Sequence, residues 1–318
     1  MFKRPISRRR FIKYMLASAA LFPYGGNFAK KAHSGPPAIN GRTPRKVKGE
    51  YDLVLARGDD PYRMTVKAVE AMGGMDRFVK KGDTVVIKPN MAWDRPPEYA
   101  ANTNPAVIAA LAELCIKAGA GRVNVFDRPC NAAERCYETS GIREAALKAG
   151  AKVYYVDDWD FIKAGFPYES PMEEWPVYRD AVECDVFINV PILKDHGLTG
   201  LTLSMKNLMG VCGGNRAFIH SDIARKLVDL TDFIKPDLTV IDAYRVLVRN
   251  GPSGGSLEDV RNVNRLIVAT DPLLADIYAC RVINHDPSSV PYIAEASRRN
   301  LWMPDAEKAK IFEFDAAI

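Results

Sequence analysis

Short apolar runs alternate with longer amphipathic stretches along most of the chain, and this alternation restricts the fold more than any other feature of the sequence. The apolar runs that we predict as strands are 51–56, 84–88, 122–127, 152–156, 185–190, 238–242 and 265–269. The stretches that we predict as helices are 61–72, 104–118, 141–149, 198–211, 221–234, 272–283 and 288–299. Because strands that alternate with helices usually pair in parallel and are buried on both sides, the sequence predicts an α/β fold with a mostly parallel sheet flanked by helices on both faces.

The segment 157–178 interrupts this alternation. It contains aromatic residues and prolines without an amphipathic period, among them Phe166, Pro167, Trp175 and Pro176. Such a composition is typical of an inserted loop or hairpin. Two roles stay open for it, a lid over a site and an excursion packed on the surface.

The positive charge of the chain is concentrated in its first 48 residues. Of the 44 Lys and Arg side chains, 12 lie in this segment, which has no Asp or Glu. The other residues carry 32 basic and all 39 acidic side chains, so their net charge is −7 although the whole chain carries +5. Nucleic-acid binding needs a basic surface that displaces counterions, so this balance gives no support for a nucleic-acid partner. No apolar run reaches the ~18 residues of a membrane span, which excludes a multi-span membrane protein.

The N-terminal segment has the features of a targeting signal. Residues 7–13 read Ser-Arg-Arg-Arg-Phe-Ile-Lys, and the apolar stretch that follows over 14–22 is too short to span a bilayer. The motif resembles the twin-arginine export signal, with Ile12 where leucine is usual. We therefore expect a twin-arginine signal segment over 1–32, a linker rich in Pro, Gly and Lys over 33–48, and a single α/β domain over 49–318.

The resemblance to this signal implies a location and a partner. It implies that the folded protein is exported by the twin-arginine machinery, to the periplasm or to an anchored position at the outer face of the inner membrane. No clean cleavage motif follows the apolar stretch, so cleavage and anchoring both stay open.

The cysteine pattern bears on the cofactors. The six cysteines have no Cys-x-x-Cys pair and no ferredoxin-like run, so the sequence has no built-in iron–sulfur motif. Cys115 and Cys280 lie in apolar helical patterns and are expected in the core. Cys212 lies between Gly210 and Gly213 and stays open as a soft metal ligand paired with a histidine.

Basic, imidazole and amide side chains follow several predicted strands at their carboxyl ends. Because parallel strands end at the same edge of a sheet, where such folds bind ligands, we expect these side chains to form one site. Its composition indicates an anionic small molecule, a carboxylate or a phosphate. The predicted ligand-binding residues are Lys88, Asn90, Lys194, Asn207 and Asp242. The predicted catalytic residues are His196, His220 and Lys206.

Each of these residue types supplies a different chemistry. A lysine can hold an anion as a point charge, and deep burial would lower its pKa and permit base or Schiff-base chemistry. A histidine can transfer protons near neutral pH. Asp242 would fix a Lys or His, or bind a metal. His196, His220 and Asp242 could instead hold a divalent metal, so that cofactor stays open. Phosphate-loop, dinucleotide-binding and serine-hydrolase motifs are absent.

An ordered series of short motifs resembles the domain-of-unknown-function 362 family, over about residues 50–285. The matching segments are 88–90, 103–105, 191–196, 203–210, 236–243, 250–252 and 271–276. The loose iron–sulfur label of this family comes from members with a ferredoxin-like cysteine cluster, which this chain lacks, so the label does not carry over. Twin-arginine signals occur in the family, in agreement with the N-terminal motif.

These features together predict an exported α/β protein that binds an anionic small molecule at the strand ends, and they leave its status as an enzyme open. The alternative function is that of a non-catalytic redox or assembly protein linked to a metal or an iron–sulfur group. Such a protein would work with a redox or membrane-associated partner.

Overall fold

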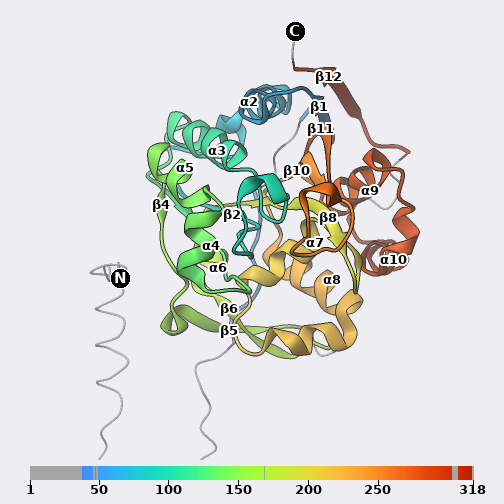
Figure 1. The fold of residues 1–318 in the computed structure, drawn as a ribbon. Coiled ribbons are helices and arrows are strands. Elements are labelled where there is room, and N and C mark those ends of the chain that lie inside the picture. The colour runs from blue at the N-terminus through green and yellow to red at the C-terminus, as the bar shows by residue number, and fades with distance from the viewer. Residues whose placement is uncertain (1–37, 46, 48, 168, 303–306, 317–318) are drawn as a thin grey trace, which may run out of the picture. The chain divides into compact units, whose positions relative to one another are not determined.

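The structure is a computed structural model that describes residues 38–45, 47, 49–167, 169–302 and 307–316. Within these residues ten strands form one sheet, with the order β12-β1-β11-β10-β7-β2-β3-β4 and with β8 paired to β10 and β9 (Figure 1). The strands are β1 (Leu53–Arg57), β2 (Thr84–Pro89), β3 (Arg122–Val125), β4 (Lys152–Val153), β7 (Val186–Val190), β8 (Ile192–His196), β9 (Gly200–Thr202), β10 (Leu238–Leu247), β11 (Val260–Ala269) and β12 (Ile311–Asp315). Most pairs are parallel, whereas β11 runs antiparallel to both neighbours and β9 runs antiparallel to β8. The predicted mostly parallel sheet is confirmed.

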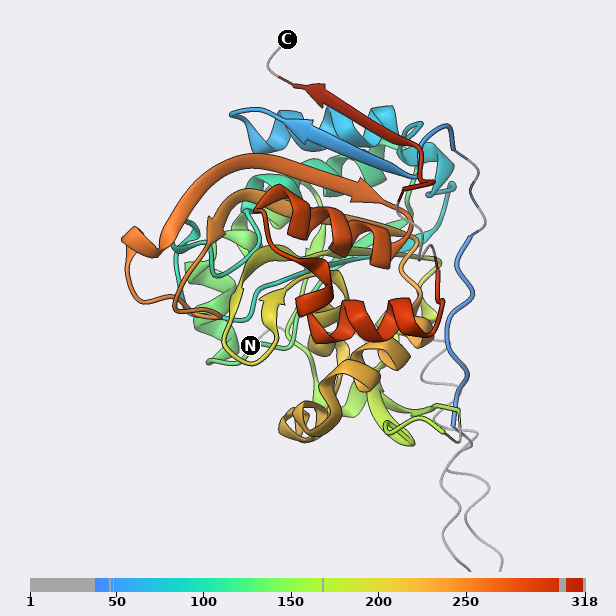
Figure 2. The ribbon, with the colours of Figure 1, turned by 90° about the vertical axis from the view of Figure 1, so that its right-hand side faces the viewer.

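Helices cover both faces of this sheet, as predicted (Figures 1 and 2). The helices are α2 (Pro61–Ala71), α3 (Pro105–Lys117), α4 (Ala133–Thr139), α5 (Ile142–Lys148), α6 (Arg179–Glu183), α7 (Ser204–Asn207), α8 (Ile223–Ile234), α9 (Pro272–Val282) and α10 (Pro291–Arg298). A separate hydrophobic cluster packs against each face of the sheet. Along β1, Val54 and Ala56 belong to the cluster that contains side chains of α2 and α3, whereas Leu53 and Leu55 belong to the cluster that contains side chains of α8, α9 and α10. This follows from the period-2 alternation of side chains along a strand.

Three of the helices begin with a capping residue that directly precedes a proline. Asp60, Asn104 and Asp271 each accept hydrogen bonds from backbone N–H groups of the first helical turn, and a proline occupies the next position. Such caps pair N–H groups that the helix itself leaves free. The predicted starts of α2, α3 and α9 are therefore confirmed to within a residue.

The predicted excursion over 157–178 is a hairpin. Its strands β5 (Phe161–Gly165) and β6 (Glu174–Tyr178) pair antiparallel as a separate two-stranded sheet. Ala164, Val177 and Tyr178 from these strands are buried in the hydrophobic cluster beneath α8. The hairpin is thus packed into the body.

The largest difference from the predicted elements lies between Pro191 and Val211. The strand predicted to end at Pro191 is followed by β8, and the predicted helix over 198–211 is instead β9, the short helix α7 and the 3-10 turn η4 (Leu208–Val211). Gly200, with a φ of 71°, adopts the left-handed conformation that the turn between β8 and β9 requires. Helical composition alone did not reveal that this backbone pairs with β8.

The described part of the predicted linker lies against the body. Arg42 is buried and pairs with Asp237 at 2.8 Å, and Arg45 pairs with Asp83 at 2.5 Å. The predicted signal segment over 1–32 lies outside the described residues. Among the helices that the structure describes, none combines the length and the hydropathy that crossing a bilayer demands.

Candidate functional site

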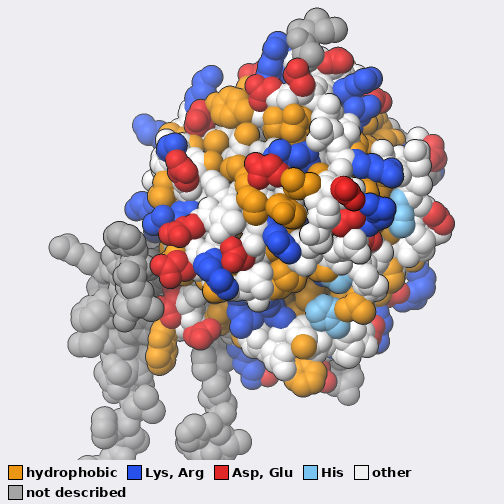
Figure 3. All heavy atoms as spheres, in the orientation of Figure 1, with side chains coloured by type: hydrophobic (Ala, Val, Ile, Leu, Met, Phe, Trp, Pro, Cys, Tyr) orange, Lys and Arg blue, Asp and Glu red, His pale blue; other side chains and the backbone are white. Residues whose placement is uncertain are grey.

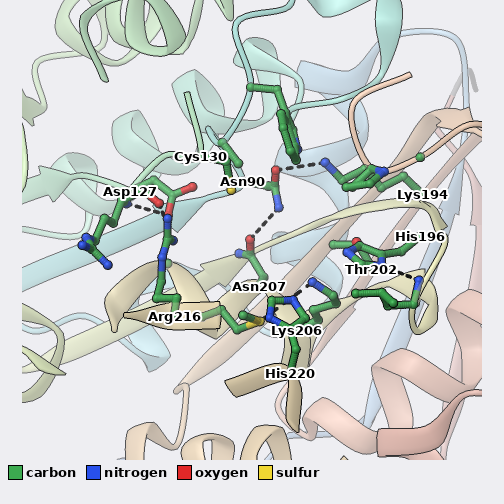
Figure 4. A pocket seen from close by; sticks show the side chains of 18 of the residues that line it. Asn90, Asp127, Cys130, Lys194, His196, Thr202, Lys206, Asn207, Arg216 and His220 are labelled. Carbon is green, nitrogen blue, oxygen red and sulfur yellow. Dashed lines mark hydrogen bonds between the residues drawn. The ribbon is translucent and has the colours of Figure 1, made fainter. Parts of the chain in front are cut away.

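A cavity of about 510 Å³ lies where β2 and β3 end, and β8, β9, α7 and the loops after them complete its wall (Figure 4). On this face of the molecule Lys and Arg side chains are interspersed with Asp and Glu, and His side chains are exposed in its lower right part (Figure 3). Seven of the eight predicted site residues line the cavity: Lys88, Asn90, Lys194, His196, Lys206, Asn207 and His220. They come from segments more than a hundred residues apart, so the fold brings together the residues that the strand-end pattern predicted.

The Lys88 ammonium uses all of its hydrogen-bond donors within the protein. Its ammonium pairs with Asp127 Oδ1 at 2.8 Å and donates to the Pro89 carbonyl at 2.6 Å and to Asn207 Oδ1 at 3.1 Å. The side chain is 1% exposed, and burial lowers its pKa while Asp127 opposes that effect. An ammonium group has three N–H donors, so Lys88 has none left over.

Two asparagines extend this network along the cavity floor. Asn90 Nδ2 donates to Asn207 Oδ1 at 3.1 Å, and Asn207 Nδ2 donates to the Lys88 carbonyl at 3.2 Å and to Asn189 Oδ1 at 2.9 Å. Asn90 Oδ1 accepts a hydrogen bond from Lys194 Nζ at 3.3 Å. The amides therefore fix the positions of the two lysines.

Lys194 and Thr202 face each other across the antiparallel strands β8 and β9. Directly opposed residues project from the same side of a strand pair, and both line the cavity. Lys194 Nζ donates to the Ala101 carbonyl at 2.5 Å and lies 5.9 Å from the ring centroid of Trp93. Burial, and next the charge of Lys206, lower the pKa of Lys194 to about 7. Thr202 is 3% exposed, and no described residue hydrogen-bonds its hydroxyl.

Lys206 projects from α7, whose N-terminal amides are held by a buried carboxyl group. Asp276 accepts from the N–H groups of Ser204 at 2.8 Å and Met205 at 3.2 Å. The Lys206 ammonium contacts Met209 Sδ at 3.8 Å, a weak acceptor, and no oxygen atom of the described chain accepts from it. Burial lowers the pKa of Lys206 to about 8.

The two histidines differ in their surroundings. His196 Nδ1 accepts from the Leu198 N–H at 3.1 Å, so the neutral ring carries its proton on Nε2. Burial, followed by the charges of Lys206 and Lys194, lowers the pKa of His196 to about 3, so the ring is neutral at physiological pH. His220 is exposed, with Nδ1 at 3.3 Å from the Ala217 carbonyl.

Several further residues line the cavity. They are Trp93, Asp127, Arg128, Cys130, Thr202 and Arg216, among others. Asp127 is the last residue of the strand predicted over 122–127 and lies two residues beyond the end of β3, so the strand-end rule applied there would have found it. Thr202 lies in a segment predicted as helix, and no sequence signal distinguishes it. Arg216 lies four residues before His220, so the sequence shows a basic residue close to a predicted site residue. Its guanidinium donates to the carbonyls of Arg128 and Pro129 at 2.7 Å each.

The cavity lining has a surplus of positive charge. Five basic residues line it against one acid, Asp127, which Lys88 already neutralises. The basic residues are Lys88, Arg128, Lys194, Lys206 and Arg216.

Asp242 does not line the cavity, contrary to the expectation that it would bind the ligand or a metal. It is buried, and its carboxylate accepts from the N–H groups of Asn104 at 2.8 Å and Tyr244 at 3.0 Å, so it braces the start of α3. Burial raises its pKa to about 6. Cys212 is also buried away from the cavity. In the described part of the chain, no three His, Cys, Asp or Glu side chains gather closely enough to share a metal ion.

The chain is similar to several known proteins in sequence or in fold. It is 30% identical over 249 residues to a thylakoid-associated protein of Synechocystis sp., covering 75% of each chain. The lactate racemase apoprotein from Thermoanaerobacterium thermosaccharolyticum has a TM-score of 0.47 at 13% identity, over 80% of this chain and 63% of that chain. A protein from Thermotoga maritima has a TM-score of 0.32 at 14% identity, over 62% and 54%. Residues 85–281 match the sequence model described as domain of unknown function DUF362, and the chain belongs to that family.

Proposed function

We propose that the protein binds a small carboxylate or phosphate anion in this cavity. One observation carries the proposal: Lys206 and Thr202 both line the cavity and are largely buried, and their Nζ and Oγ1 atoms have no oxygen partner in the described chain. Buried polar groups in proteins are almost always hydrogen-bonded, and an unpaired donor costs free energy. An anion would accept hydrogen bonds from both groups and would balance the surplus positive charge.

The side chains divide into a frame and a binding group in this proposal. Lys88, Asn90 and Asn207 bond one another and so hold the cavity floor in place. Lys194, Lys206 and Thr202 would contact the anion. His220, which is exposed to solvent, is the candidate for proton transfer. Neutral His196 can donate a hydrogen bond to the anion from Nε2–H.

Isothermal titration calorimetry with oxalate and with inorganic phosphate tests this function. In Lys206→Met, the loss of one charged contact should weaken the binding of at least one of these anions roughly tenfold or more. Lys148→Met is the matched control, because Lys148 is exposed on α5 and pairs only with Glu144. Equal binding in wild type and Lys206→Met, or no binding of either anion by the wild type, would end the proposal.

We also propose export through the twin-arginine route. The motif over residues 7–13 and the apolar stretch after it support this, and the thylakoid-associated description of the Synechocystis relative supports a membrane-associated setting. In cell fractionation, the full-length chain should appear in the periplasmic or membrane fraction. The double substitution Arg8→Lys and Arg9→Lys should retain it in the cytoplasm. An unchanged distribution would contradict export by this route.

A further inference from the structure

We propose that Lys206 forms a reversible imine with a small 2-oxo acid whose carboxylate is held by Lys194 and Thr202. This inference rests on the proposed anion-binding function and names the class of ligand. An imine-forming lysine needs an amine that can reach a cavity, surroundings that favour its neutral form, and groups that orient the carbonyl compound. The cavity supplies all three.

The Lys206 amine is the one best suited to attack. Lys88 donates its three N–H groups to Asp127, Pro89 and Asn207. Lys194 donates to Ala101 and Asn90. Lys206 contacts only the Met209 thioether, and it is less buried than either. Its nitrogen is therefore free to approach a bound carbonyl carbon, while Asp276 holds the helix from which it projects.

The surroundings of Lys206 favour the neutral amine. Burial and the nearby positive charge of Arg216 lower its pKa to about 8. A lysine beside another cation is a familiar way to obtain a nucleophilic amine near neutral pH. Burial is the main cause of the lowered pKa of Lys194, and the charge of Lys206 is the second. Once Lys206 loses its proton, this second cause is removed, which favours the charged form of Lys194. The two lysines thus take different roles.

The β8–β9 pair supplies the carboxylate holder. Charged Lys194 has three N–H groups and uses two of them within the protein, which leaves one for a ligand. Thr202 lies opposite Lys194 in register, and its hydroxyl has no hydrogen-bond partner among the described residues, so it can donate to the second carboxylate oxygen. Trp93 borders the same space. A carboxylate fixed there would place an adjacent carbonyl group toward Lys206 (Figure 4).

The reaction balances with the groups present and water. The Lys206 lone pair attacks the carbonyl carbon, a C–N bond forms as the C=O π bond breaks, and one proton moves from the nitrogen to the oxygen to give a carbinolamine. The hydroxyl then leaves as water, the C=N bond forms, and one equivalent of water is released per imine. His220, open to solvent, can carry the proton between these two steps.

Reductive trapping tests the inference. The full-length protein is incubated with pyruvate and cyanoborohydride at pH 7, where the hydride reduces the imine to a stable secondary amine, and the adducts are mapped by peptide mass spectrometry. We expect the adduct on Lys206 to exceed that on the exposed Lys148, and excess oxalate to suppress it. Acetone, a carbonyl compound without a carboxylate, should show a smaller preference for Lys206 over Lys148 than pyruvate does.

Lys206→Arg separates the covalent step from anion binding. Arginine keeps the positive charge but forms no such imine, so the variant should lose the adduct at position 206. A cooperative urea-unfolding curve like that of the wild type shows that the variant folds. A wild-type adduct on Lys206 no stronger than on Lys148, or one on Lys194 in its place, would overturn the imine. If oxalate or phosphate then still binds, the proposed anion-binding function stands; if no anion binds, both fall.

Discussion

Gly210 lies directly against Asp127: a Cβ atom built on Gly210 would fall 1.9 Å from Asp127 Oδ1 and 2.6 Å from Lys88 Nζ. The close approach of this backbone to a buried ion pair is what lets the loop after α7 close one side of the cavity. Any side chain here must displace the pair or the loop.

We therefore expect Gly210→Ala to destabilise the protein by about 1–3 kcal/mol, the usual range for overpacking, and to weaken anion binding. Urea unfolding and calorimetry measure the two effects. Gly197→Ala is the control, because Gly197 also borders the cavity but a Cβ there meets no atom within 4 Å. Equal stability of the two variants would show that the pair moves aside without cost.

The buried pair of Lys88 and Asp127 should behave as a unit. Removing one partner leaves the other charge unpaired, so Lys88→Met or Asp127→Asn should each cost about 3–5 kcal/mol. The double variant should cost clearly less than the sum of the two, because it leaves no uncompensated charge. Denaturant unfolding of all four proteins gives the coupling free energy. Additive effects would mean that the two side chains contribute independently.

Oxalate affinity should fall as the pH rises from 6 to 9. Lys194 and Lys206 have pKa values lowered to about 7 and about 8, so both lose their positive charge across this range, and an anion binds best to the charged forms. Arg216, Cys130, His196 and His220 line the same cavity as these lysines. Calorimetry at several pH values, with Lys206→Met for comparison, measures the slope. The slope should be shallower in that variant, and a flat wild-type profile would contradict these assignments.

Thr202→Val should raise stability and weaken anion binding. Valine has nearly the same shape, and it removes a buried hydroxyl that has no described partner, so the gain is about 1 kcal/mol. The same change removes a donor to the ligand. Thr202→Ser, which keeps the hydroxyl, should leave oxalate binding close to that of wild type. A Thr202→Val variant that binds oxalate as well as Thr202→Ser would exclude the hydroxyl from the site.

Much of the fold and of the site could be predicted from local pattern. Apolar runs with period-2 faces gave β2, β3, β7 and the core of β10, and Asp60, Asn104 and Asp271 marked helix starts. The paired strands β8 and β9 could not be predicted this way, because a strand stabilised by its neighbour needs no strong signal of its own. Thr202, which lies on β9, was missed for the same reason.

The sequence by itself determined that lysines, histidines and asparagines would follow the strands and meet at one edge of the sheet, because side-chain periodicity and chain direction are local properties. Only the tertiary structure decided which of them stay free. Lys88 and Lys206 have identical side chains, yet Lys88 meets Asp127, Pro89 and Asn207, whereas Lys206 meets a thioether. Asp242 ends a predicted strand like the others but faces the N–H groups of Asn104 and Tyr244. A polar group's availability depends on which partners distant segments bring within about 3 Å, and no local pattern encodes that.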